Sequence, residues 1–181
     1  SKPLEIQLDD KVEITDDLKY AIDKAEIVLL VVATSGIRPV CKQLREAGLN
    51  DKQILVNLSK GLELPSLKRM SEVIKDELPT SKLVILSGPT LAKEILNGCP
   101  TAACAASEDM EAAEFVQKHL TVPSKFRIYT NPDVIGVELG GSLKNVIAIA
   151  SGFADAMHLG DNCRGTLLTR GMAEIVRVSI A

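Results

Sequence analysis

Two lysines stand in settings where an amine could do chemistry. Lys60 lies in NLSKGLE, residues 57–63, directly after a short apolar run, and Lys144 lies in GVELGGSLKNVIAIASG, residues 136–152. Burial disfavours the charged form of a lysine, and a lysine whose pKa falls toward neutrality can act as an acid or a base. A lysine that stays charged can instead stabilise an oxyanion.

Each lysine also has a plainer interpretation. Lys60 could be a solvated loop residue, and Lys144 could extend from the edge of a helix with only its aliphatic part covered. Leu143 and Val146 flank the Lys144 segment on either side, and two glycines precede it. We therefore expect Lys144 to be more than a solvent-facing residue, although the pattern alone leaves both interpretations open.

A third segment is SGPTLAKEI, residues 87–95, which has the pattern of a strand end, a Gly-Pro turn and the start of a helix. The free N–H groups of a first helical turn, together with the hydroxyl of Thr90, could hold an anion. The alternative is that Thr90 only caps the helix and binds nothing.

The rest of the chain must position these segments. Its pattern predicts strands over residues 27–33, 53–58, 83–86, 101–105 and 126–129, alternating with helices over residues 17–25, 39–48, 66–78, 90–98 and 108–120. Strict alternation predicts an α/β fold with a parallel sheet and helices on its faces. The continuous apolar run over 27–33 predicts a strand buried on both faces, and residues 34–36 read as a turn before Pro39 opens the next helix. Ligands bind at the carboxyl ends of strands in such sheets, which is where Lys60 lies.

The pattern changes at residue 131. Residues 133–156 read as one long helix capped by Asn131 or Asp133, followed by a loop and a helix over 164–179. Interior glycines cost roughly 1 kcal/mol each in a helix, so Gly140, Gly141 and Gly152 suggest close approach of another backbone or a ligand. We expect a partial Rossmann-type domain over 1–131 and the start of an all-helical substrate domain over 132–181.

Composition argues against several classes of partner and site. The net charge of -3 offers no basic excess for a nucleic-acid partner, and no apolar run reaches the roughly 20 residues of a membrane span. Four cysteines without a CxxC pair and two separated histidines predict free thiols in a reducing compartment and no metal site. The sequence lacks the G-x-G-x-x-G turn that opens a dinucleotide-binding sheet.

The three segments, in this order and spacing, resemble the NAD(P)-dependent glycerol-3-phosphate dehydrogenases. The similarity is strongest over NPDVIGVELGGSLKNVIAIASGFADAMHLGDNCRGTLLTRGMAEI, residues 131–175. NLSKGLE and SGPTLAKEI match the family's Lys-Gly and Gly-Pro-Ser/Thr segments, and IVLLVVAT resembles the strand beside the cofactor. The resemblance covers essentially the whole chain.

The resemblance implies hydride transfer between NAD or NADP and C2 of sn-glycerol 3-phosphate or dihydroxyacetone phosphate. It implies that Lys144 is the catalytic proton acceptor and also contacts substrate, and that Lys60 contacts both substrate and cofactor. The further residues that match binding positions are Gly88, Thr90 and Asn145 for substrate and Ala92 for cofactor. Residues 160–162, GDN, are interpreted as a structural loop of the helical domain.

Parts of the family pattern do not appear in this chain. The Gly-rich turn would precede Ser1, and the arginine for the substrate phosphate and an acidic partner would follow Ala181. We therefore expect the chain to be part of a longer protein, and the 181-residue chain alone to show no turnover. Cofactor-dependent reduction of dihydroxyacetone phosphate by this polypeptide would refute that expectation.

Two alternatives stay open at this point. One is a β-hydroxyacid or 6-phosphogluconate type of dehydrogenase, which also places a lysine in a helix after the sheet. The other is a non-catalytic, dehydrogenase-like binding module. We expect a small phosphorylated substrate as partner, allow a homodimer, and expect a cytoplasmic location with an organellar form left open.

Overall fold

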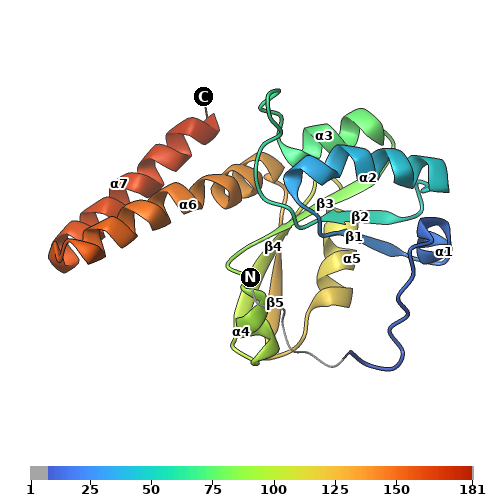
Figure 1. Cartoon of the computed structure of the whole chain (residues 1–181), viewed down its shortest axis with the longest axis horizontal. Coiled ribbons are helices and arrows are strands. Elements are labelled where there is room, and N and C mark those ends of the chain that lie inside the picture. Colours follow the sequence, from blue (N-terminus) through green and yellow to red (C-terminus); the bar gives the residue numbers. More distant parts are fainter. Residues whose placement is uncertain (1–7, 181) are drawn as a thin grey trace.

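The computed structural model describes residues 8–180 and shows a sheet with covering helices, from which a helical hairpin projects (Figure 1). The elements are α1 (Leu18–Ile22), β1 (Ile27–Leu30), α2 (Thr34–Ala47), β2 (Ile54–Asn57), α3 (Met70–Glu77), β3 (Lys82–Ser87), α4 (Ala92–Leu96), β4 (Thr101–Ala106), α5 (Met110–Leu120), β5 (Phe126–Asn131), α6 (Val134–Ala156) and α7 (Gly160–Ile180). The predicted α/β fold, with alternating strands and helices followed by helices alone, is confirmed.

The five strands lie in the order β1-β2-β3-β4-β5, and all neighbouring pairs are parallel except β3 and β4, which are antiparallel. The prediction of a wholly parallel sheet is therefore wrong at one pairing. A parallel connection needs a crossover over one face of the sheet, usually by a helix. Between β3 and β4 the chain forms only the five-residue α4, which lies beyond the end of the sheet in Figure 1, so β4 returns beside β3 in the opposite direction.

Helices cover both faces of the sheet. α2 and α3 pack on one face, where Leu55 and Ile85 are buried, and α5 packs on the other face against Val56 and Val84. The expectation that the first strand is buried on both faces is wrong, because Leu29 in β1 is 46% exposed. Within the described residues, β1 is an edge strand that pairs with β2 alone.

One predicted turn and one predicted loop are helical instead. The segment over 34–36 is the first turn of α2, in which the Gly36 N–H donates to the Ala33 carbonyl at 2.8 Å, so Pro39 lies inside the helix. The segment over 160–162 opens α7 instead of forming a structural loop. Gly48, with a φ of 94°, ends α2 as expected, because glycine adopts this left-handed conformation without a steric penalty.

Helix α6 connects the sheet to the projecting hairpin. Asp133 caps it by accepting from the Gly136 N–H at 2.8 Å, its first turns contact β3 and β4, and the rest packs along α7. Within residues 8–180, α6 is the one helix whose length and composition would suffice to cross a membrane. Its early turns carry Glu138, which is buried and ion-paired with Arg69, so this end of the helix is anchored within the protein.

An ionic cluster holds the loop between Lys60 and α3. The Arg38 guanidinium on α2 donates to both carboxylate oxygens of Glu63, at 2.7 and 2.9 Å, and also bonds Glu77 and Asp76 on α3. This bidentate arrangement is a favoured geometry for an arginine and a carboxylate. The loop that carries Lys60 is therefore tied to two helices of the α/β body.

The Arg38–Glu63 pair predicts a specific response to acid. Hydrogen bonds from Arg38 and, to a smaller extent, from Ser66 lower the pKa of Glu63 from an ordinary 4.5 to about 2, so they stabilise the fold above pH 4.5 and that contribution is lost as the pH falls toward 2. In Arg38→Met we expect the pKa of Glu63 to rise toward 4.5 and acid unfolding to begin at higher pH. Carboxyl NMR titration and circular dichroism measure the two effects. Arg45→Met is the control: it removes a different partner of Glu77 and should not change the pKa of Glu63. If Arg38→Met also left the pKa of Glu63 at its wild-type value, the prediction would be contradicted.

Candidate active site

The loop that carries Lys60 begins with a side-chain turn at the carboxyl end of β2. The buried Asn57 side chain donates to the Ser59 carbonyl at 3.0 Å and accepts from the Ser59 N–H at 3.2 Å. The Ser59 hydroxyl donates to the Val32 carbonyl just beyond β1. Gly61 has a φ of 138°, and a Cβ there would lie 2.9 Å from a methyl carbon of Thr34, so any other residue would strain the turn. These contacts fix the backbone on both sides of Lys60.

Lys60 joins the first predicted segment to the second. Its Nζ donates to the Gly88 carbonyl at 3.1 Å and to the Thr90 Oγ1 at 3.3 Å. Thr90 precedes Leu91, which is the N-cap of α4, so the alternative that Thr90 caps this helix is wrong. A Cβ at Gly88 would lie 2.8 Å from the Ala102 carbonyl oxygen, so a glycine is needed for this turn to pack against β4.

Helix α6 brings the third segment to the same strand ends. A Cβ at Gly141 would lie 2.5 Å from the Ser87 hydroxyl oxygen and 3.7 Å from Cγ of Lys60, so this glycine is closely approached by side chains, where another backbone or a ligand was predicted. At Gly140 and Gly152 an added Cβ would meet no atom of the described residues within 4 Å, so the predicted approach of another backbone is wrong for these two glycines. One glycine therefore marks the contact between α6 and the sheet.

Lys144 lies on α6 beyond this contact and is exposed. The expectation that its apolar neighbours bury it is wrong, because Leu143 is only half-buried and Val146 is itself 63% exposed. Its Nζ donates to Oδ1 of Asn145 at 2.8 Å. The turn of α6 that precedes Lys144 nevertheless lies against Lys60, because a Cβ at Gly141 would lie 3.7 Å from Lys60 Cγ, and the charge of Lys144 contributes to lowering the pKa of Lys60.

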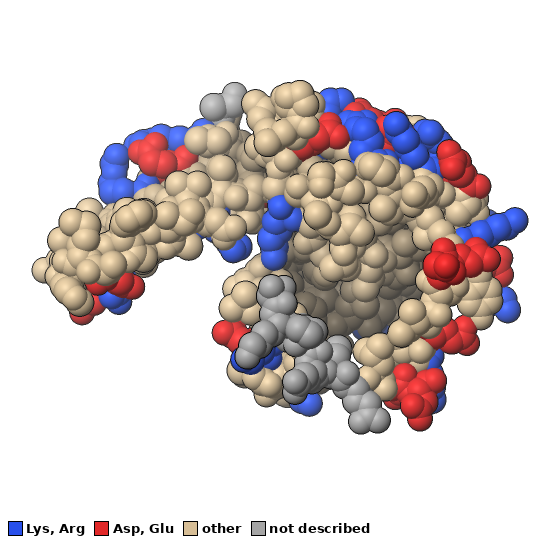
Figure 2. Space-filling view, viewed as in Figure 1, with Lys and Arg blue, Asp and Glu red and all other residues tan. Residues whose placement is uncertain are grey.

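The two lysines give the strand ends a positive charge. Burial lowers the pKa of Lys60, and the charge of Lys144 lowers it further. Within the part of the chain that the structure describes, neither ammonium group forms an ion pair with a carboxylate. Figure 2 shows Lys and Arg atoms projecting into the hollow between the helical hairpin and the body. An anion or a developing oxyanion between the two lysines would reduce their mutual repulsion.

This arrangement predicts an effect that needs no ligand. In Lys144→Met we expect the pKa of Lys60 to rise toward its ordinary value without reaching it, because burial, the larger cause of the lowering, remains. Titration of the lysine Cε resonances by NMR measures this pKa. Lys93→Met on α4 is the matched control, and an equal pKa of Lys60 in wild type and Lys144→Met would show that the two amines do not interact.

Sequence reasoning passed over several residues that shape this site. Asn57 and Ser59 form the turn before Lys60. Ser87 packs against Gly141 of α6, and Glu138 anchors the same helix through its ion pair with Arg69. An asparagine at the end of an apolar strand was a usable signal for a turn. A single glutamate in an apolar stretch was a signal for a buried partner. Among the predicted binding residues, Ala92 lies at the exposed start of α4, and the roles of all of them stay predictions.

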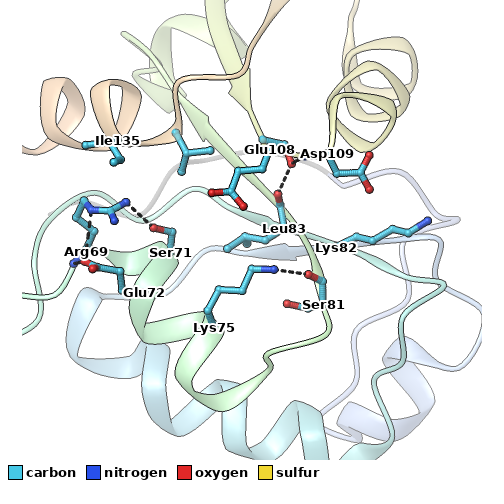
Figure 3. Close-up of a pocket in the computed structure, with 12 residues that line it drawn as sticks. Arg69, Ser71, Glu72, Lys75, Ser81, Lys82, Leu83, Glu108, Asp109 and Ile135 are labelled. Atoms are coloured by element: carbon cyan, nitrogen blue, oxygen red, sulfur yellow. Dashed lines mark hydrogen bonds and ion pairs between the residues drawn. The ribbon is translucent and has the colours of Figure 1, made fainter.

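A separate cavity of about 390 Å³ lies at the opposite end of β3, near Lys82 and Leu83 (Figure 3). Charged side chains of both signs line it, among them Arg69, Lys75 and Glu108. In Figure 3 Arg69 reaches toward Ser71, and none of the residues predicted for substrate or cofactor lines the cavity. It is therefore distinct from the lysine site.

The fold and the strand-end site define a class: a Rossmann-type sheet of the kind found in NAD(P)-dependent dehydrogenases, followed by helices. Comparison with known families makes this specific. The chain matches the family model "NAD-dependent glycerol-3-phosphate dehydrogenase N-terminus" over residues 3–113 and the corresponding C-terminus model over residues 133–181. The chain belongs to the NAD-dependent glycerol-3-phosphate dehydrogenase family, and the resemblance noted in the sequence is confirmed.

Individual relatives agree. A glycerol-3-phosphate dehydrogenase [NAD(P)+] of Listeria monocytogenes is 49% identical over 180 residues, which are 98% of this chain and 53% of the relative. One of Clostridium perfringens is 49% identical over 164 residues, covering 91% of this chain and 49% of the relative. The chain thus spans about half the length of the curated relatives it matches.

Solved structures show the same architecture. The glycerol-3-phosphate dehydrogenase of Coxiella burnetii matches with a TM-score of 0.80 and 35% identity, over 89% of this chain and 49% of that one. The enzyme of Saccharomyces cerevisiae matches with a TM-score of 0.84, over 96% of this chain and 52% of that one, and at 22% identity it supports the fold alone.

Proposed function

We propose that this protein transfers a hydride between NAD(P)H and dihydroxyacetone phosphate, and in reverse from sn-glycerol 3-phosphate. The observation that carries the proposal is the hydrogen bond of Lys60 to Thr90 at the strand ends, with the turn of α6 that precedes Lys144 packed against Lys60, in a chain of this family. The positive charge of the two lysines, which no carboxylate of residues 8–180 pairs with, suits a substrate that is both phosphorylated and about to develop negative charge on oxygen.

Each residue has a definite role in this proposal. Lys144 donates a proton to the C2 oxygen during reduction and takes it back in the reverse direction. Asn145, which accepts from Lys144 Nζ at 2.8 Å, orients that amine and contacts the substrate. Lys60 adds a second positive charge beside the substrate, and Gly88 and Thr90 hold Lys60 and form part of the substrate-binding surface.

The strand ends also fit the nicotinamide end of a dinucleotide, which supplies or accepts the hydride when bound. The carboxyl ends of β1, β2 and β3 share one edge because these strands are parallel. Val31 is 69% exposed just beyond β1, one residue before the Val32 carbonyl that Ser59 contacts, and offers an apolar surface at this end of the sheet. We propose Lys60 and the small Ala92 as the residues that contact NAD or NADP.

Further parts of the proposal concern the whole protein. We propose that residues 1–131 belong to the dinucleotide-binding domain and 132–181 to the helical substrate domain. We also propose that the protein works in the cytoplasm and forms a homodimer, without a nucleic-acid partner or a membrane span. Size-exclusion chromatography with light scattering on the complete gene product tests the dimer.

A substrate panel tests the proposed reaction. The complete gene product is supplied with NADH or NADPH and, in turn, dihydroxyacetone phosphate, a β-keto acid and the 3-keto acid derived from 6-phosphogluconate. We expect oxidation of the cofactor with the triose phosphate alone. A preference for either acid would favour a related dehydrogenase, and binding without turnover of any substrate would favour a non-catalytic module.

A further inference from the structure

Glu138 has a set of contacts that its place in an apolar helix does not explain. Its side chain is only 6% exposed and bonds Nη1 of Arg69 at 2.8 Å. It also accepts from the Ser71 backbone N–H at 2.8 Å and from the Ser71 hydroxyl at 2.6 Å. One carboxylate on α6 is thus held by three donors at the start of α3.

Glu138 also lies next to the lysine site. Glu138 lines a small cavity together with Lys60 and Ser87, and Ser142, one turn further along α6, donates to the Glu138 carbonyl at 2.8 Å. In the same turn Gly141 lies against Ser87. Glu138 and Gly141, three residues apart on one face of α6, therefore join this helix to the start of α3 and to the end of β3.

We propose that Glu138 is a positioning residue. Its hydrogen bonds to the start of α3 fix the position of α6 on the sheet, and so hold Lys144 beside Lys60. The catalytic consequence rests on the proposed function, whereas the placement of the two amines does not. Lys144 lies six residues beyond Glu138, roughly 9 Å along the helix at 1.5 Å per residue, so a tilt at the contact displaces the amine.

A structural role alone would not require a carboxylate here. A buried ion pair carries a large desolvation penalty, and well-packed apolar residues in its place are often equally stabilising or more so. An apolar side chain lets a helix slide or rotate, whereas three directional hydrogen bonds fix both its rotation and its position along the axis. The carboxylate therefore suits a site in which the placement of α6 matters.

The first test uses this chain and needs no ligand. Glu138→Gln and Ser71→Ala each weaken the hydrogen bonds between Glu138 and the start of α3. The control is Glu72→Gln, which removes the other carboxylate beside Arg69 and does not change α6. We expect the pKa of Lys60, followed by NMR, to rise in the first two variants, because Lys144 moves away, and to stay constant in the control. Loss of the negative charge of Glu138 would by itself lower that pKa, so a rise identifies the movement of α6.

Ser71→Ala changes no charge and keeps Arg69, so it remains informative if Glu138→Gln fails to fold. A pKa of Lys60 that is unchanged or lowered in every folded variant would overturn the proposal, whatever reaction the protein catalyses.

The second test measures catalysis in the complete gene product. In Glu138→Gln we expect kcat with dihydroxyacetone phosphate to fall by about 10- to 100-fold, as small misplacements of a catalytic group do, while KM for the cofactor changes less than threefold. In Glu72→Gln both constants should stay within about twofold. A Glu138→Gln protein that keeps the wild-type kcat would overturn the proposal. An inactive wild type would instead refute the proposed function. The first test would then still decide whether Glu138 positions Lys144 beside Lys60.

Discussion

Replacing Lys144 with alanine in the complete gene product is expected to lower kcat for reduction of dihydroxyacetone phosphate by about 10²- to 10³-fold, the loss typical for removal of one group that stabilises an oxyanion. KM for the cofactor should change little, because Lys144 acts on the substrate oxygen. Steady-state oxidation of NADH or NADPH measures both constants. The effect follows from the place of the amine: it is exposed, oriented by Asn145 and close to Lys60.

Two further variants make this prediction specific. Lys144→Arg keeps a positive charge but cannot release a proton near neutral pH, so it should recover only a small part of the activity. Lys42→Ala, an exposed lysine on α2, should behave as wild type. A Lys144→Ala protein with the wild-type kcat would remove this residue from the mechanism.

Replacing Lys60 with methionine is expected to lower kcat/KM for the triose phosphate by about 10- to 100-fold, the equivalent of losing one charged hydrogen bond of 1.5–3 kcal/mol. Methionine keeps most of the volume of the lysine and removes its charge. The loss should be divided between KM and kcat, because Lys60 contacts bound substrate throughout the reaction in our proposal. Initial rates over a range of substrate concentrations separate the two constants.

The control for Lys60 is Lys60→Arg. An arginine retains the charge but not the geometry of the bonds to Gly88 and Thr90, so we expect partial recovery of kcat/KM. Wild-type constants in Lys60→Met would place the substrate elsewhere and would leave Lys60 as a residue that only holds the Gly88 turn.

The elements of the fold were predictable where local patterns govern them. The apolar runs of β2 and β3 and the Gly48 stop of α2 lie where the sequence places them. The antiparallel pairing of β3 and β4 was not predictable from alternation, because it depends on where the short helix α4 packs. The exposure of Leu29 depends likewise on which strand forms the edge of the sheet.

The site was predictable at the level of segments but not of contacts. Lys60 and Thr90 come from loops whose position at a strand end follows from the pattern, and their hydrogen bond confirms that the two segments meet. The burial of Lys144 was predicted wrongly, because apolar neighbours in a helix indicate burial only if another element covers them. The Glu138–Arg69 pair joins residues 69 positions apart, and no local pattern reveals such a partner.

The central claim is that the amine of Lys144 acts on the oxygen of the substrate during hydride transfer. Single-turnover oxidation of NADH by the complete gene product, with saturating dihydroxyacetone phosphate, tests it most directly when Lys144→Ala is measured with and without added methylamine. We predict a slow hydride-transfer step in the variant that methylamine accelerates in proportion to its concentration, with no such effect on Lys42→Ala. Hydride transfer in Lys144→Ala at the wild-type rate, with no response to the amine, would contradict the account.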